Sequence, residues 1–422
     1  MTLLPEKKGS FLLTWIFLIL VCTTNHAWAE FKLMHDIIIS PNLYLAEEYT
    51  DNLLLEPSNE EADFLTTLYP NIGLRYAGKH LTFRGNYGHK FIYYKDNPEY
   101  DQTSFKDTLN SFASATVLPQ NDFNVILQHD VQRASFGDRY TFNEENDLVN
   151  KTRRTSYRIN PNYTFNNIRT FWARADYLYR KTEYDDSRGN DAETHQVTLR
   201  LQKDLNDRED TLRAELQGAR VETEQYDNYE RIHATVGGLL HLGPSWYVEG
   251  DIGRARIDPR NGSSFDITIG NLFLNYDEGA THARVGYAVT FPGSYDVDAY
   301  KTELAEAGIV FKKRAILGVH VRAKRDHYFE DNNEDESLRS TIRLDVPLSK
   351  RVWMDLTGDW SIYKFEPEDI TDRRYGAGVG LYRVFRWGEA GILYRYNEQD
   401  SDDNSRDYAS NYVRLYLNIP IY

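Results

Sequence analysis

Residues 338–362, LRSTIRLDVPLSKRVWMDLTGDWSI, hold two segments in which apolar and polar side chains alternate. On a β-strand successive side chains point to opposite faces, so each segment has one apolar and one polar face. The apolar face carries Leu338, Ile342, Leu344, Val346 and Leu348, and then Val352, Met354, Leu356, Trp360 and Ile362. The polar face carries Arg339, Thr341, Arg343 and Asp345, and then Asp355, Thr357 and Asp359. The stretch predicts two antiparallel strands joined by a short turn.

The same alternation recurs along the chain, at roughly 20 residues per strand and connection. Residues 154–180 give a second example, with Tyr157 and Ile159 on one face and Arg154 and Arg158 on the other. The expected strands are about 11–15 residues long, whereas strands of soluble proteins average about 5–6 residues. A membrane-spanning strand needs about 9–11 residues. The strand length therefore suits a membrane better than a soluble sheet.

One apolar and one polar face alone fits a soluble β-sandwich array, a propeller or a membrane barrel. Two further features favour the barrel. Tight and long connections alternate along the chain, and aromatic residues gather near strand ends, as in outer-membrane barrels. We therefore predict an all-β fold, a transmembrane antiparallel up-and-down β-barrel of about 20 strands (range about 16 to 22) in the bacterial outer membrane.

The N-terminus resembles a secretory leader. Lys7 and Lys8 precede a 12-residue apolar run, Phe11–Cys22, and Ala27–Ala29 gives the A-x-A pattern of a cleavage site. The run is shorter than the roughly 20 residues of a spanning helix, which disfavours a membrane anchor. We expect a signal peptide at 1–29, a short periplasmic lead-in at 30–37 and the barrel at 38–422. Without Cys22, the one cysteine, the mature chain has no disulfide.

Composition narrows the classes of partner and function. The net charge is −15, so nucleic acid is not an expected partner, because phosphate binding needs a basic surface. Mean hydropathy is −0.62, which agrees with a barrel because only one face of each strand must be apolar. The histidines show no metal-ligand spacing, and no nucleophile motif appears. We expect no enzyme activity, no catalytic residue, no cofactor and no metal.

Three expected loops are acidic, at 184–191, 330–336 and 398–407. They could hold a divalent cation, but none has the glycine-centred spacing of a calcium loop. Solvated external loops are the favoured interpretation, since charge runs without a motif are usually solvated. Outer-membrane lipid and lipopolysaccharide are then the expected partners on this side.

Many arginines fall on the polar strand faces. On the lipid face at mid-depth each would cost about 2–4 kcal/mol, so they are expected to face the lumen. The candidate lining residues are Arg154, Arg158, Arg174, Arg180, Arg200, Arg213, Arg322, Arg339, Arg343 and Arg414, with Trp172, Trp353 and Tyr416. Two interpretations stand side by side. The lining forms a hydrated passage that attracts anionic sugars, or it forms an internal salt-bridge network that fills and stiffens the barrel.

Residues 40–76, SPNLYLAEEYTDNLLLEPSNEEADFLTTLYPNIGLRY, carry three short motifs. They are an E-x-Y-T-D-N strand end at 48–52, an S/A-D-F-x-T strand start at 62–66 and a P-x-I/L-x-L element at 70–74. This hairpin resembles the opening of the β-barrel porins associated with exopolysaccharide and PEP-CTERM/exosortase loci. The resemblance implies an outer-membrane barrel that serves a surface-polysaccharide pathway, with periplasmic export proteins as partners and no catalytic residues.

The last strand departs from the common assembly signal of outer-membrane proteins. Tyr422 supplies the terminal aromatic residue, but the apolar residues Val413 to Ile421 fall on the even positions counted back from it. The strand is nevertheless clearly amphipathic. The function we expect is a passive conduit or accessory for surface-polysaccharide export. The alternative is a structural or adhesive surface barrel with a plugged lumen.

Overall fold

The computed structural model describes most of the chain after the expected leader. The described residues are 31–34, 37–58, 60–135, 151–168, 170–186, 189–206, 209–224, 228–291, 300–329, 333–366 and 368–421. The expected signal peptide at 1–29 lies outside them. No helix of this part is long and apolar enough to cross a membrane.

Strands make up nearly all of the described structure. Their bounds are β1 (Phe31–Met34), β2 (Ile37–Thr50), β3 (Asp63–Ala77), β4 (Leu81–His89), β5 (Phe91–Tyr94), β6 (Leu109–Val117), β7 (Phe123–Ser135), β8 (Lys151–Ile168), β9 (Phe171–Tyr184), β10 (Ala192–Asp204), β11 (Thr211–Thr223), β12 (Tyr229–His241), β13 (Trp246–Pro259), β14 (Phe265–Glu278), β15 (Thr281–Thr290), β16 (Tyr300–Lys312), β17 (Ile316–Tyr328), β18 (Glu334–Pro347), β19 (Val352–Phe365), β20 (Ile370–Phe385), β21 (Gly388–Ser401) and β22 (Tyr408–Pro420). Three helical turns interrupt the loops, η1 (Pro98–Tyr100), α2 (Phe105–Thr108) and η2 (Asn404–Arg406).

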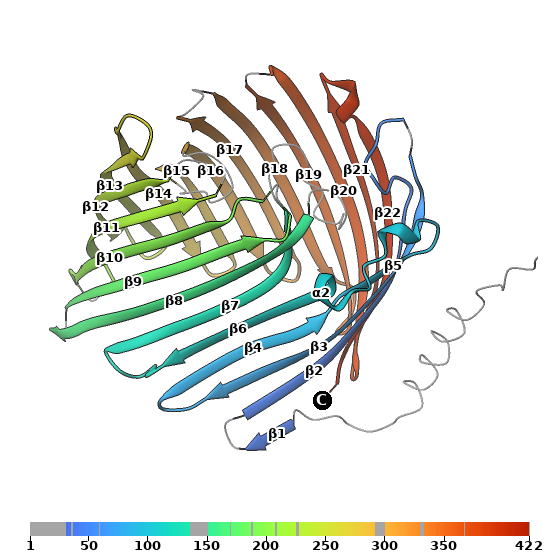
Figure 1. The fold of residues 1–422 in the computed structure, drawn as a ribbon, viewed down its shortest axis with the longest axis horizontal. Coiled ribbons are helices and arrows are strands. Elements are labelled where there is room, and N and C mark those ends of the chain that lie inside the picture. Colours follow the sequence, from blue (N-terminus) through green and yellow to red (C-terminus); the bar gives the residue numbers. More distant parts are fainter. Residues whose placement is uncertain are drawn as a thin grey trace, which may run out of the picture.

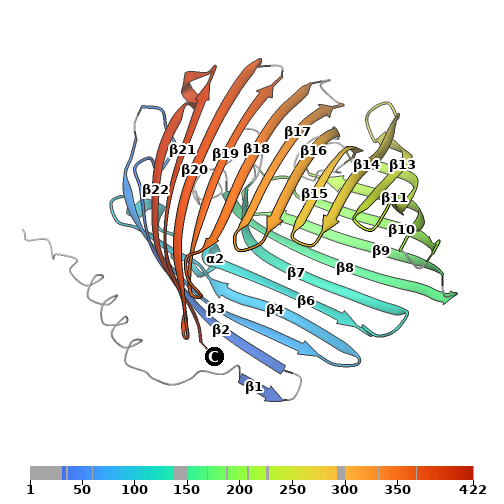
Figure 2. The same ribbon diagram turned by 180° about the vertical axis from the view of Figure 1, so that it is seen from behind.

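The strands form one closed antiparallel barrel. Each pairs with its sequence neighbour, and β2 pairs with β22 to close the ring, so the blue and red ends of the chain lie side by side in Figures 1 and 2. β4 and β5 pair with successive parts of β3 and count as one barrel strand, which gives 20 strands in the ring. β1 lies outside this count and pairs with the start of β2. The predicted fold class and strand number are confirmed.

The two ends of the barrel differ in the length of the connections between strands. The nine connections at the end that holds both termini span two to six residues, whereas the ten at the other end span four to fifteen residues, and five of these exceed six. Both kinds of connection can be followed in Figure 1, where β1, the start of β2 and the C-terminus lie at the same end of the barrel. This arrangement matches outer-membrane barrels, in which short turns face the periplasm and longer loops face the outside.

The outer face of the barrel is apolar and open to the surroundings. Ile252 and Leu272 are 64% and 62% exposed, and Val236 is 59% exposed. A soluble protein rarely leaves such a large apolar surface uncovered. In a bilayer the same surface contacts hydrocarbon, and the closed ring has no open strand edge among the described residues, as that environment requires. The even apolar positions of β22 belong to this face, since Leu415 is 52% exposed.

The residues of the E-x-Y-T-D-N motif close the barrel. We define the closure seam as residues 48–52 of β2 and its following turn, together with residues 409–414 of β22. Its side-chain contacts are Glu48 to Arg414 at 2.9 Å, Thr50 to Ser410 at 3.3 Å, Asp51 to Asn411 at 2.6 and 2.7 Å, and Asn52 to the Ala409 carbonyl at 3.1 Å. The motif that carries the family resemblance thus joins the first long strand to the last.

Candidate lumenal site

Strand alternation places every candidate lining residue on the inner face. In each of their strands the opposite face holds apolar side chains that are well exposed, such as Ile159 in β8, Val197 in β10 and Ile342 in β18. The inner set is Arg154, Arg158, Arg174, Arg180, Arg200, Arg213, Arg322, Arg339, Arg343, Arg414, Trp172, Trp353 and Tyr416. Their role in lining a passage stays a prediction.

A chain of ion pairs crosses four neighbouring strands of the inner wall. Arg200 of β10 bonds Asp176 of β9 at 3.3 Å and Glu215 of β11 at 2.7 Å. The same Glu215 accepts a hydrogen bond from His233 of β12 at 3.2 Å. The cation therefore sits between two carboxylates, which stabilises it and fixes its direction.

A second ion pair joins β11 to β13 across the intervening strand β12. The guanidinium of Arg213 in β11 forms a fork with Asp251 in β13, with distances of 2.6 and 2.5 Å. Gly237 of β12 lies between them, and a Cβ there would come within 2.2 Å of the Asp251 carboxylate. Asn271 of β14 completes the group by donating to Asp251 at 3.0 Å. The absence of a side chain at Gly237 is what lets the pair cross the strand.

The network continues around the wall. Arg284 of β15 bonds Glu249 of β13 and Glu306 of β16, both at 3.2 Å, and lies 3.7 Å from the centre of the Phe273 ring. Glu306 also faces Arg322 of β17 at 3.4 Å. Carboxylates and cations thus alternate from β9 to β17. We call this set the lumenal network.

Several of the remaining candidate residues have partners elsewhere on the inner wall, away from the lumenal network. Arg343 bonds Asp345 at 3.0 Å, and Arg154 lies 3.5 Å from Asp130. Tyr416 donates to Glu389 at 2.9 Å. The structure therefore groups Trp172, Arg200 and Arg213 but leaves most of the other candidates in separate places.

Paired arginines and open space occur together in the lumen. The side chains of Arg343 and Arg322 remain 67% and 51% exposed although they point inward. Such exposure requires space beside them on the inner side of the wall. The salt-bridge interpretation of the sequence thus describes the contacts, and it leaves room for the passage interpretation.

A pocket of about 490 Å³ opens between the strands of the lumenal network. We call it the lumenal pocket. Its size falls within the range of roughly 300–1,000 Å³ typical of small-ligand sites. It is lined by Trp172, Arg200, Leu201, Gln202, Arg213, Ala214, Glu215, His233, Thr235, Asp251, Ile269, Gly270, Asn271, Val289, Thr290 and Phe291.

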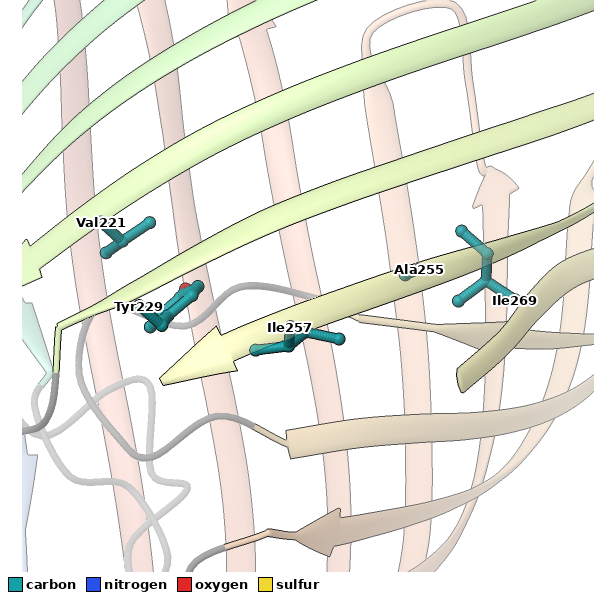
Figure 3. Close-up of a cluster of buried hydrophobic side chains, with 5 residues drawn as sticks. All are labelled: Val221, Tyr229, Ala255, Ile257 and Ile269. Atoms are coloured by element: carbon teal, nitrogen blue, oxygen red, sulfur yellow. The ribbon is translucent and has the colours of Figure 1, made fainter. Parts of the chain in front are cut away.

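The inner wall is not polar throughout. Val221, Tyr229, Ala255, Ile257 and Ile269 form a buried apolar cluster, shown in Figure 3. In β11 and β13 these side chains share the inner face with the ion-paired residues of the lumenal network. Phe291 packs on the cluster, with its ring centre 5.9 Å from that of Tyr229. The expectation of a polar inner face therefore fails toward the loop ends of β11–β13.

Sequence reasoning missed several members of the network. Asp251, Asn271, Arg284 and Glu306 were not among the candidates, although their positions also alternate with exposed apolar residues. Alternation could have placed them on the inner face. It could not have paired them, because pairs such as Arg213 with Asp251 depend on strand register and on Gly237.

The acidic loops form no metal centre within the described ranges. There, no group of three or more His, Cys, Asp or Glu side chains is placed to hold a metal ion. The expected loop at 398–407 is shorter in the structure, because β21 continues to Ser401. Asp403 in this loop accepts hydrogen bonds from the backbone and side chain of Ser405, and the Ser405 side-chain contact lowers its pKa.

No family model and no curated protein sequence matches the chain. Among solved structures, the siderophore receptor PirA from Pseudomonas aeruginosa matches with a TM-score of 0.50 and 12% identity, over 90% of this chain and 80% of that one. A BenF-like porin from Pseudomonas fluorescens Pf-5 matches with a TM-score of 0.46 and 9% identity, over 90% of this chain and 98% of that one. The OccK2 (OpdF) structure from Pseudomonas aeruginosa matches with a TM-score of 0.46 and 10% identity, over 92% of this chain and 98% of that one.

These likenesses concern the fold. The place of the molecule follows from the closed ring and its exposed apolar outer face, which fit a bilayer. The chain is an outer-membrane β-barrel. What it carries or contacts is not given by the fold, because one fold hosts many functions.

Proposed function

We propose that this barrel is a passive conduit for cell-surface polysaccharide during export. The observation that carries the conduit is the inner wall, where the inward-pointing, ion-paired side chains of Arg343 and Arg322 stay 67% and 51% exposed. A hydrated, hydrogen-bonding wall suits a hydrophilic cargo. No chemistry is required of the protein in this role.

The cargo is proposed from the sequence of the first hairpin. Residues 40–76 resemble porins associated with exopolysaccharide loci, and that resemblance supports a polysaccharide cargo and periplasmic export proteins as partners. The motif residues themselves lie in the closure seam, so they support the kind of barrel rather than the contact with cargo. Contacts with cargo belong to the lumenal wall.

Lipopolysaccharide is the proposed partner of the outer face near the loop end. Charged pairs occur there on the outward side, for example Arg325 with Glu336 at 2.5 Å and Lys301 with Glu303 at 2.5 Å. Charged groups at this level can meet lipid headgroups, whereas the apolar surface below them meets acyl chains.

Planar-bilayer conductance of the purified full barrel tests the conduit. We expect steady channels whose current falls when an oligosaccharide of the cognate polymer is added. A verified folded barrel that stays silent would contradict the proposal. That result would favour the structural or adhesive barrel with a plugged lumen, for which the apolar cluster around Phe291 is the supporting observation.

A further inference from the structure

We propose that the lumenal pocket is a binding subsite for an uncharged sugar residue. The inference rests on the proposed function, because a sugar chain reaches the pocket only if the barrel admits it. It adds to that function a binding place on the inner wall and the chemical class of the sugar bound there.

The polar lining can bind hydroxyl groups. Arg213 uses part of its guanidinium fork on Asp251 and its side chain is 38% exposed. Glu215, which bonds Arg200 and His233, is 28% exposed. A guanidinium has five N–H donors and a carboxylate about four acceptor positions, so both groups keep capacity for a ligand. Sugar hydroxyls, which donate and accept, match such a mixed lining.

The same pocket offers aromatic and apolar surface. Trp172 and Phe291 line it together with Ile269. A sugar ring has a face of C–H groups as well as an edge of hydroxyls. Aromatic side chains combine a large apolar surface with specific contact geometry, so Trp172 is suited to cover such a face.

The charges of the pocket favour a ligand without net charge. Its lining contains two arginines, Arg200 and Arg213, and two carboxylates, Glu215 and Asp251. Each arginine is already bonded to at least one carboxylate. A uronate would add a negative charge beside Glu215 and Asp251 that neither arginine of the pocket is left to balance, which costs free energy. This argument departs from the expectation that lumenal arginines attract anionic sugars.

Position also supports a role in transit. The pocket takes residues from successive strands between β9 and β15, so a chain that moves along this wall must pass it. Trp172 is the second residue of β9, near the short-turn end of the barrel. A sugar chain arriving from the periplasm would meet Trp172 early in its passage.

Isothermal titration of the full barrel in detergent tests the subsite. The probes are maltohexaose, which is uncharged, and hexagalacturonate, which is anionic. We expect maltohexaose to bind, and hexagalacturonate to bind at least about tenfold more weakly. We expect Trp172→Ala to weaken maltohexaose binding by about tenfold, the size of one lost aromatic contact. Trp172→Phe, which keeps an aromatic ring, should retain most of the affinity.

The matched control is Trp246→Ala, which removes an indole that is 45% exposed on the outer face. It should leave maltohexaose binding unchanged. Each variant is first shown to be folded by its heat-dependent migration in electrophoresis. The subsite is overturned if folded Trp172→Ala binds maltohexaose like the parent, if hexagalacturonate binds as tightly as maltohexaose, or if neither sugar binds. An open channel without sugar binding removes the subsite and leaves the conduit, whereas a silent barrel removes the conduit.

Discussion

The closure seam and the lumenal network are both built from charged and amide side chains, yet they differ in what those side chains join. In the seam, Asp51 and Asn52 bond groups of β22 that lie 360 and 357 residues away in sequence. In the network, Arg200 and Glu215 are 15 residues apart and link strands that are consecutive in the sequence, although the strands of both regions also pair through their backbones.

This difference shows that a recognisable motif and a ligand-binding surface need not coincide in this chain. The seam contains the recognisable E-x-Y-T-D-N string, and its contacts hold the ring closed. The network contains no motif, yet it surrounds the lumenal pocket. The recognisable part of this chain therefore identifies the barrel, while the chemistry toward a ligand lies where residues have only their alternation in common.

The largest expected effect is on the seam. The double variant Asp51→Ala/Asn52→Ala removes five side-chain hydrogen bonds, of which three cross to β22. At about 1 kcal/mol for each bond, the free energy of unfolding should fall by about 3–5 kcal/mol. Urea unfolding of the barrel in lipid vesicles measures it.

The control for the seam is Asp403→Ala/Asn404→Ala, the same pair of changes in an external loop. There the side-chain bonds of Asp403 go to the nearby Ser405, so the loss should stay below about 1 kcal/mol. Equal losses in the two double variants would break the comparison between the seam and the rest of the molecule.

A second test concerns the assignment of strand residues to the lipid face or the lumenal face. Leu344→Arg places a charge on the lipid face and should destabilise the barrel by about 2–4 kcal/mol. Arg343→Leu changes the neighbouring residue, whose side chain faces the lumen and is 67% exposed, and folding should remain near normal. Folding into vesicles is followed by heat-dependent migration. Similar folding yields for both variants would show that the inward and outward faces are misassigned.

A third test concerns the two glycines, Gly237 and Gly376, that lie next to ion-paired carboxylates. A Cβ at Gly237 would lie 2.1 Å from the backbone oxygen of Gly250 and 2.2 Å from the Asp251 carboxylate. Gly237→Ala must therefore move backbone as well as the ion pair, and we expect a loss of about 1–3 kcal/mol. At Gly376 the nearest atoms belong only to the side chain of Asp359, which bonds Arg395.

Gly376→Ala is the matched variant for this third test. Because a side chain can rotate away, its loss should be smaller than that of Gly237→Ala, and urea unfolding compares the two. A larger loss at Gly376 would contradict the distinction between backbone and side-chain obstruction.

The smallest expected effect on stability is at the short turn between β10 and β11. Asp210 accepts hydrogen bonds from the backbone nitrogen of His241 at 2.6 Å and from the Asn206 amide at 2.6 Å, and these lower its pKa to about 2. A carboxylate with a lowered pKa stabilises the fold above its unfolded pKa of about 3.9, and the contribution is lost as the pH falls through about 2. Asp210→Asn should therefore lose less stability than the parent between pH 4 and pH 2.

Acid titration of unfolding, followed by tryptophan fluorescence, measures this effect. Asp122→Asn, in the turn between β6 and β7, controls for the removal of one turn carboxylate. If Asp210→Asn and the parent show the same acid dependence, the hydrogen bonds of Asp210 do not stabilise the turn.

Alternation, together with strand length, connection lengths and aromatic strand ends, was sufficient to predict the barrel, and alternation by itself gave the faces of the polar strand residues. It placed Arg343 inward and Leu344 outward, as the structure has them, because a strand offers only two faces. The phase of the apolar residues in the last strand is explained in the same way, since Leu415 and Ile421 on this face are 52% and 40% exposed.

Alternation could not predict what side chains on the inner face contact. The fork between Arg213 and Asp251 needs the register of three strands and the missing side chain of Gly237. The apolar cluster at Val221 and Ile257 was also missed, because these residues lie on a face that the pattern marks as polar. Local sequence determines the face of a strand, whereas these contacts depend on residues that are distant in sequence.

The closure seam has a consequence for how the molecule is made. Thr50 meets Ser410, so the ring cannot close before the last strand has been delivered to the site of assembly. Until then β2 and β22 are free edges whose unpaired backbone groups can join another chain. The growing sheet must be shielded at both edges during its transit, and a chain that ends before β22 keeps both edges open.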